Sequence, residues 1–161
     1  MKKTFSLILS LLLILSAFTI TAYAQDSAET GRVISEEVEY FEDGSCMVIT
    51  LVEETDGILA RAASTKSYTK NALYKDSDGN TLWAAKLTAK FSYTGSSATC
   101  TSSTAAYSIS KSTWKCTKNT ASKSGRTATG NFTFKHYLGI VPIKTVNKTI
   151  TISCSNSGVI S

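Results

Sequence analysis

The sequence predicts an all-β protein, an antiparallel β-sandwich, and three observations lead to that prediction. The segment TLWAAKLTAKFSY (81–93) alternates apolar and polar residues almost without error, as a half-buried strand does. Turn residues at regular spacing divide most of the chain into about eight such segments. The 101 residues from Arg61 onward include 34 Ser or Thr, a composition that suits strands with polar outer faces better than helices.

The first 24 residues are predicted to be a secretory signal peptide. Two lysines near the start precede an apolar run of 14 residues, Leu7 to Ile20, and the TAYA that follows places Ala22 and Ala24 in the small-residue positions of a cleavage site. The run is shorter than the roughly 20 residues of a membrane-spanning helix. We therefore expect cleavage after Ala24 and an exported chain, from Gln25, with no transmembrane segment.

Charge divides the expected mature chain into two parts. Residues 25–60 hold ten acidic residues and one arginine, a net charge of −9, whereas residues 61–161 hold fourteen basic and two acidic residues, a net charge of +12. Blocks of one sign often mark interaction surfaces or tails. The sequence thus predicts an acidic β-hairpin segment with a linker at 25–60, followed by a basic, Ser/Thr-rich sandwich body at 61–161.

The acidic segment, EEVEYFEDGSCMVITLVEE, is predicted to be a hairpin around Asp43-Gly44, a dipeptide suited to a tight turn with positive φ. Three apolar residues of its second strand share one face: Met47, Ile49 and Leu51. Their expected cross-strand partners are Val38 and Tyr40.

Six further strands are predicted in the body, at 66–75, 81–93, 98–109, 112–120, 128–138 and 146–154. The apolar parity of the second of them predicts that Trp83, Leu87 and Phe91 lie in the core. The segment GIVPI interrupts the last two strands, and Pro142 within it favours an edge or a bend over a central position in a sheet.

Four cysteines remain after the expected cleavage: Cys46, Cys100, Cys116 and Cys154. An even number in an exported chain permits two disulfides, and no pair has the C-x-x-C spacing of a redox or zinc site. Structural disulfides are our first interpretation and buried free thiols the second. We favour a Cys100–Cys154 bridge, which would close a loop of 55 residues and stabilise the fold by about 4 kcal/mol on the chain-entropy argument.

An immunoglobulin-like sandwich is one alternative within the predicted fold class. Cys100, Trp114 and Cys154 follow the Cys–Trp–Cys order of immunoglobulin domains. However, Ile152 stands where those domains carry a tyrosine, and only seven residues follow Cys154. We do not expect membership of the true family.

No set of residues indicates catalysis or metal binding. DSDGN places Gly79 fourth and Leu87 twelfth, whereas a calcium loop needs Gly sixth and Glu twelfth, so a turn explains the segment. His136 is the only histidine, and the body has no acid outside that turn to orient it. We therefore predict no catalytic residue, no metal site and no cofactor. We expect His136 to end a strand and to pack against Phe134 or Tyr137.

Basic residues on polar strand faces and turns of the body are the candidate binding residues. Lysines that are solvated or that guard sheet edges explain them without a ligand. The functional interpretation is an anionic partner: a cell-wall polymer, an anionic lipid or an acidic glycan. Nucleic acid is not an expected partner, because export would separate the chain from nucleic acid in the cell, and the sequence has no recognition motif for it. The candidates are Lys86, Lys90, Lys111, Lys115, Lys118, Lys123, Arg126 and Lys135, and Lys144 and Lys148 have the same character.

Three segments, YFEDGSCMVITLVEE, ARAASTKSYTKNALYKDSDGNTLWAAKLTAKFSYTGSSATCTS and KTITISCSNSGVIS, resemble small exported proteins of Gram-positive bacteria that have no assigned function. The resemblance implies export and a β-rich domain, and it implies no site residues. Cys46 and Cys116 are less typical of that pattern than Cys100 and Cys154.

The function expected from the sequence is therefore a secreted or cell-surface-associated, non-catalytic module that binds an anionic polymer or glycan of the cell envelope. One alternative is an antimicrobial or toxin-like protein whose acidic segment masks the basic body until proteolysis near Arg61. A hydrolase is the least favoured alternative.

Overall fold

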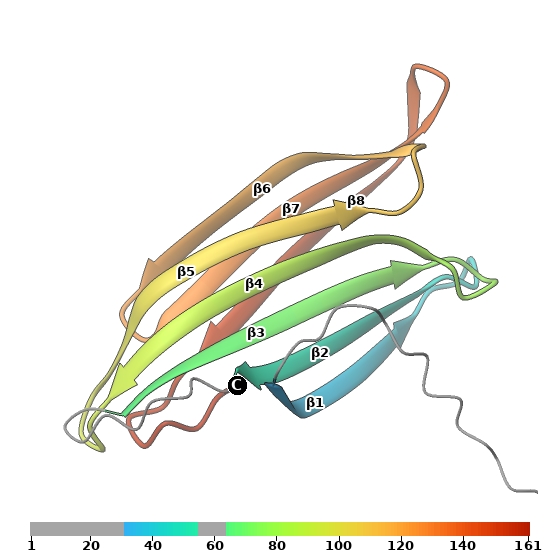
Figure 1. Ribbon diagram of the computed structural model, residues 1–161. Coiled ribbons are helices and arrows are strands. Elements are labelled where there is room, and N and C mark those ends of the chain that lie inside the picture. The colour runs from blue at the N-terminus through green and yellow to red at the C-terminus, as the bar shows by residue number, and fades with distance from the viewer. Residues whose placement is uncertain (1–30, 55–63) are drawn as a thin grey trace, which may run out of the picture.

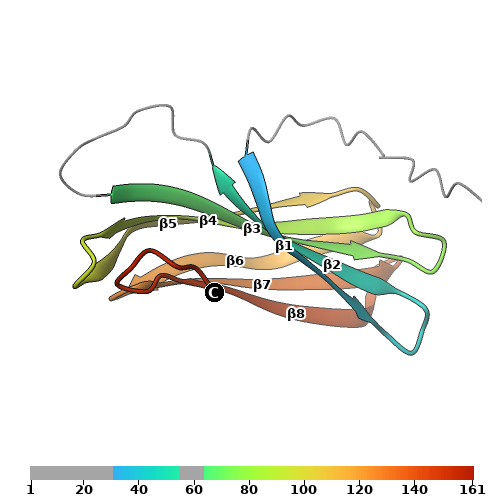
Figure 2. The same ribbon diagram turned by 90° about the horizontal axis from the view of Figure 1, so that it is seen from below.

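The computed structural model describes residues 31–54 and 64–161, so the predicted signal peptide and most of the predicted linker lie outside the described residues. The described chain forms eight strands in two antiparallel sheets that pack face to face, which confirms the predicted β-sandwich (Figures 1 and 2). The strands are β1 (Gly31–Tyr40), β2 (Cys46–Glu54), β3 (Ser64–Lys75), β4 (Thr81–Tyr93), β5 (Ala98–Ile109), β6 (Trp114–Ser124), β7 (Thr127–Leu138) and β8 (Val141–Ser153).

Strands that are neighbours in a sheet are also neighbours in the sequence. One sheet has the order β1-β2-β3-β4-β5 and the other the order β6-β7-β8. Short turns with a glycine at positive φ, such as Gly44 at 77° and Gly79 at 83°, join β1 to β2, β3 to β4, β4 to β5, β6 to β7 and β7 to β8, as predicted for Asp43-Gly44. The described strands therefore lack the crossing connections of a Greek key, and the connectivity is not that of an immunoglobulin domain.

The core lies between β3–β5 and the three-stranded sheet. Trp83, Leu87 and Phe91 are completely buried, as their parity predicts. The Trp83 ring lies between Tyr74 on β3, at 5.1 Å between ring centroids, and Phe134 on β7, at 3.8 Å. Because parallel aromatic rings from both sheets meet there, Trp83 joins the two layers at the centre of the sandwich.

The acidic hairpin belongs to the five-stranded sheet. β2 pairs with β3 over its whole length, and Met47 and Leu51 of β2 are buried in the core. The backbone of the three-stranded sheet contacts β3, β4 and β5, whereas β1 lies at the outer edge of the five-stranded sheet. As a result, every residue of β1 after Gly31 is exposed.

The predicted cross-strand pairing within this hairpin is wrong. Val38 lies opposite Val48, and Tyr40 lies opposite Cys46, so neither faces Met47. The turn spans residues 41–45, which sets the register one residue away from the expected pairing, and such a shift moves side chains to the other face. Val38 and Tyr40 are consequently 43% and 78% exposed.

The two sides of the sandwich differ. On the β5–β6 side, the amide of Cys100 donates to the carbonyl of Gly125 at 2.8 Å, and Asn119 Nδ2 donates to the Ala105 carbonyl at 3.3 Å. The other side lies between β1–β2 and the edge strand β8. Pro142 lies near the start of this edge strand, beside a register shift, as predicted for an edge or a bend.

Candidate functional site

A pocket of about 250 Å³ is lined by residues of the β1–β2, β3–β4 and β5–β6 connections together with residues of β3, β4, β6, β7 and β8. It contains the titratable groups that come closest to an active-site arrangement among the described residues. The lining residues with titratable or hydroxyl side chains that could take part in chemistry are Asp43, Ser45, Asp76, Lys111, His136 and Lys144.

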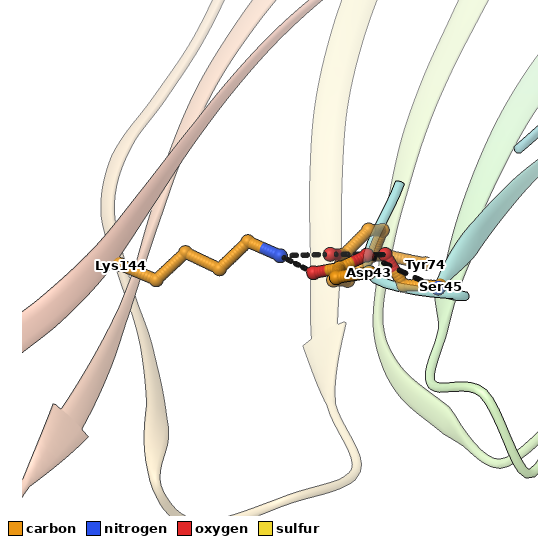
Figure 3. Close-up of polar contacts among 4 residues, drawn as sticks. All are labelled: Asp43, Ser45, Tyr74 and Lys144. Atoms are coloured by element: carbon orange, nitrogen blue, oxygen red, sulfur yellow. Dashed lines mark hydrogen bonds and ion pairs between the residues drawn. The ribbon is translucent and has the colours of Figure 1, made fainter. Parts of the chain in front are cut away.

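A network centred on Lys144 occupies one wall of this pocket (Figure 3). Lys144 Nζ on β8 donates to Asp43 Oδ2 at 2.5 Å and to the Tyr74 hydroxyl at 2.6 Å. Ser45 Oγ lies 2.8 Å from the same hydroxyl and also donates to Asp43 Oδ1. The network therefore connects the β1–β2 turn and β3 with β8, across the two sheets.

The charges in this network are mutually satisfied. Hydrogen bonds from Lys144 and Ser45 hold the pKa of Asp43 well below its ordinary value. Burial acts to lower the pKa of Lys144, but its hydrogen bonds to Asp43 and Tyr74 raise that pKa overall. An aspartate with a strongly lowered pKa and a lysine that stays protonated are unsuited to act as general acid or general base at neutral pH. We refer to this network of Asp43, Ser45, Tyr74 and Lys144, which connects the two sheets, as the clasp.

His136 lies in the same pocket but is held by an aromatic contact. Its ring stacks on Trp114 with centroids 5.0 Å apart and planes 6° apart. The two residues are directly opposite each other on β7 and β6, which corrects the expectation that His136 ends a strand against Phe134 or Tyr137. The register between β6 and β7 decides this contact. The alternation of residues within one strand does not specify that register.

The DSDGN segment is a turn, as predicted. The amides of Asp78 and Asn80 donate to Asp76 Oδ1 at 3.1 and 2.9 Å, and hydrogen bonds from Asn80 lead the effects that lower the pKa of Asp76. Gly79 adopts the positive φ of this turn. Within 31–54 and 64–161, no cluster of three or more His, Cys, Asp or Glu is arranged to hold a metal ion.

All four cysteines are free thiols in the structure, so the favoured Cys100–Cys154 disulfide is not formed there. Cys100 and Cys154 are both buried in the core, and the electrostatic interaction with Cys154 contributes to the rise in the pKa of Cys100, for which burial is the main cause. Their amides donate to the consecutive carbonyls of Gly125 and Arg126, at 2.8 and 3.0 Å, which brings both to the β6–β7 turn.

The structure distributes the candidate binding residues over opposite surfaces. Lys86 and Lys90 lie on the outer face of the five-stranded sheet, because they alternate with the buried residues of β4. Lys115 and Lys118 on β6 and Lys135 on β7 lie on the outer face of the three-stranded sheet. The remaining candidates lie elsewhere: Lys111 in the β5–β6 loop, Arg126 at the β6–β7 turn, and Lys123 on β6, where it donates to the Thr101 carbonyl.

The outer face of the three-stranded sheet combines these lysines with hydroxyl and amide groups. Thr133 donates to Asn147 at 2.9 Å, and Thr149 donates to Asn131 at 3.1 Å across the β7–β8 pair. Residues 79–161 contain no Asp or Glu. This face is therefore polar, and all of its charged residues are basic. The alternation within β6, β7 and β8 does not show which residues of the three strands lie side by side on it.

Sequence reasoning missed a second surface feature, the tip of the β7–β8 hairpin. GIVPI is predicted to interrupt two strands, but the structure uses it to form the turn and the first residues of β8. Leu138, Ile140, Val141 and Ile143 are 73%, 93%, 58% and 55% exposed. Four apolar residues in a connecting segment are the signal that would have identified this tip.

Comparison of the chain with protein-family profiles, curated protein sequences and solved structures found no match. The described part of the chain contains no helix of the length and apolarity needed to cross a membrane.

Proposed function

We propose that the chain is an exported, non-catalytic binding module that attaches to an acidic polymer of the cell envelope through the outer face of its three-stranded sheet. One observation carries the proposal: Lys115 lies directly opposite Lys135 on a sheet that contains no acidic residue. Like charges that face each other across two strands destabilise a sheet. A bound polyanion would supply the missing negative charge.

The surroundings of this lysine pair support a polymeric ligand. Lys118 shares the face, and rows of Thr, Asn and Ser side chains extend from it along β7 and β8. Hydroxyl and amide groups can bind phosphate, carboxylate and sugar hydroxyl groups. An extended polar face with several dispersed cations suits a repeating acidic chain better than a small ligand.

The pocket lined by Asp43 and Lys144 supports a non-catalytic role. Its Asp43 and Lys144 are bound to each other across the sheets, and its Asp76 accepts hydrogen bonds from its own turn. Catalytic acid–base pairs have environments that push their pKa values toward the working pH. Here the shifts of Asp43 and Lys144 move away from it.

The alternative of a masked toxin has less support. Release of the acidic segment would remove β2 from the five-stranded sheet and would expose the core next to Met47 and Leu51. Emptying a single large buried apolar site already destabilises a protein by about 2–5 kcal/mol. The acidic hairpin therefore serves the fold, and we do not favour its removal as an activation step.

The test is binding of the mature chain, residues 25–161, to immobilised poly(glycerol phosphate) and to a polyuronate, with neutral dextran as the reference. The site variant is Lys115→Gln/Lys135→Gln. The matched control is Lys86→Gln/Lys90→Gln, which removes the same charge from the opposite sheet. We expect binding to both acidic polymers at low salt, which weakens as the screening length falls from about 30 Å at 0.01 M to about 8 Å at 0.15 M.

The site variant should lose most of this binding, and the control should retain it. Equal losses in the two variants would show that net charge alone determines binding, which would overturn the assignment to this face. No binding of the unmodified chain at 0.01 M salt would overturn the proposed function itself.

A further inference from the structure

The β7–β8 hairpin projects beyond the other turns of the sandwich (Figure 1). β6 begins at Trp114, opposite His136, and the amide of Tyr137 donates to the Thr113 carbonyl, so β7 has only β8 beside it from Leu138 onward. The two strands end in the pair Leu138–Val141, joined by Gly139 and Ile140. The tip, defined here as residues 138–143, is therefore a narrow two-stranded projection.

The turn geometry does not require these apolar residues. Gly139 has φ 62°, and Ile140 has no positive φ, which is the pattern of a type II′ turn with glycine in the first central position. The second central position of such a turn accepts Asn, Ser or Thr. Ile140 is nevertheless isoleucine and is 93% exposed, so a requirement other than folding selects it.

The other turns of the described chain show what is usual for this protein. Their central residues are polar or glycine: Asp43-Gly44, Asp78-Gly79, Gly95-Ser96, Ser124-Gly125 and Ser157-Gly158. The β7–β8 tip is the exception among them. A concentrated apolar patch on a soluble surface marks a site of contact with a protein or a membrane.

The charge next to the tip selects between these two contacts. Lys135 is three residues before Leu138, and Lys115 lies opposite Lys135 with its Nζ 5.2 Å from the centroid of the Tyr137 ring. An apolar projection above tyrosine and lysine matches the order of a lipid surface, where acyl chains lie beneath an interfacial layer and anionic headgroups.

We propose that residues 138–143 form a membrane-contact tip, which places Leu138, Ile140 and Val141 at the boundary between headgroups and acyl chains of an anionic phospholipid bilayer. Lys115 and Lys135 then contact the headgroups, and Tyr137 lies at the interface between the two. This contact differs from the proposed polymer site in depending on the apolar tip. It would hold an exported chain at the outer membrane surface, and because the two contacts share Lys115 and Lys135, a bilayer and an acidic polymer would compete for this pair.

The test measures sedimentation of the mature chain with vesicles of phosphatidylglycerol and phosphatidylcholine in equal parts, and with pure phosphatidylcholine vesicles. The tip variant is Ile140→Thr/Val141→Thr, and the matched control is Val33→Thr/Val159→Thr, which alters two exposed valines away from the tip. We expect the tip variant to bind anionic vesicles at least about tenfold more weakly, because it loses apolar area. The control should bind like the unmodified chain.

The tip variant separates this proposal from the proposed function, because Lys115 and Lys135 serve both contacts. Lys115→Gln/Lys135→Gln should weaken vesicle binding by roughly fivefold per lysine and should also abolish polymer binding. The tip variant should leave polymer binding unchanged. An unmodified chain that binds anionic vesicles but no acidic polymer would contradict only the proposed function, and one that binds the polymer but no anionic vesicles would contradict only the tip.

A spectroscopic measurement tests insertion directly. Trp83 and Trp114 are buried, so an Ile140→Trp variant adds an exposed fluorophore whose emission should shift to shorter wavelength with anionic vesicles. A Val159→Trp control should show no shift. Equal vesicle binding by the tip variant and the unmodified chain would overturn the proposal. So would dimerisation that the tip variant abolishes without vesicle binding, because that result assigns the tip to a second copy of the chain.

Discussion

β4 and β1 both belong to the five-stranded sheet, yet they have opposite environments. Trp83, Leu87 and Phe91 of β4 are completely buried against the three-stranded sheet, whereas Val33 and Val38 of β1 are 60% and 43% exposed. The reason is that three strands cover only β3–β5, which leaves β1 beyond the edge of the second layer. Position relative to the second sheet, and not strand pairing, therefore decides how much each strand contributes to stability.

The exposed strand β1 and the β1–β2 turn contact the second sheet through ion pairs, whereas β2 also contributes Met47 and Leu51 to the core. Asp43 contacts Lys144, and Glu39 lies 3.7 Å from Lys148, so the acidic hairpin is connected to β8 by charge. Exposed ion pairs typically contribute about 0–1 kcal/mol each. The covered half of the sheet, β3–β5, should therefore tolerate substitution much less than the exposed half that ends in β1.

The largest expected difference between the two halves comes from emptying one apolar site in each. Trp83→Ala should destabilise the protein by about 3–5 kcal/mol, because it removes the ring between Tyr74 and Phe134. Val38→Ala on β1 should change stability by at most about 0.5 kcal/mol. Urea denaturation followed by circular dichroism measures both, and similar midpoints for the two variants would contradict the comparison.

Oxidation should act on the covered half. Cys100 and Cys154 are both buried in the core and both bond through their amides to the β6–β7 turn, so mild oxidation of the purified chain should join this pair before it joins Cys46 or Cys116 to any partner. The gain in stability should reach at most about 4 kcal/mol, because the bridge restricts the unfolded chain. Non-reduced peptide mapping identifies the bridge, and an adduct through Cys46 or Cys116 as the main product would contradict the prediction.

The clasp should have a smaller effect. Lys144→Met removes the donor to Asp43 and Tyr74 and should cost about 1 kcal/mol, since solvent screens a partly exposed lysine. Lys148→Met is the matched control on the same strand, where the contact to Glu39 is longer, and it should cost less than about 0.5 kcal/mol. A cycle with Asp43→Asn should show coupling for Lys144 alone.

The smallest expected effect is a pH dependence that originates in the same clasp. The folded pKa of Asp43 is lowered by Lys144 and Ser45, so its stabilising contribution is complete above the unfolded pKa of 3.8 and is lost as the pH falls below it. The advantage of the unmodified chain over Asp43→Asn should therefore shrink between about pH 5 and pH 2 in thermal denaturation. In a Lys144→Met background this convergence should be weaker, and an unchanged convergence would mean that Lys144 is not its cause.

The sequence by itself determined the strands, most of the turns and the buried face of β4. Alternation between Trp83 and Phe91 and the dipeptide Asp43-Gly44 are local signals, because the geometry of adjacent residues sets both the two-residue period and the turn. The class of the fold follows from the same signals, since strands joined by short turns pair as antiparallel neighbours.

Only the tertiary structure decided which surfaces these strands form. It separates Lys86 and Lys90 from Lys115 and Lys135, and it joins Lys144 to Asp43 across the two sheets. It also leaves β1 uncovered and extends the β7–β8 tip beyond its neighbours (Figure 1). The physical reason is that the packing of one sheet on another depends on contacts between residues far apart in sequence, whereas a periodic pattern specifies only which side of its own strand a residue occupies.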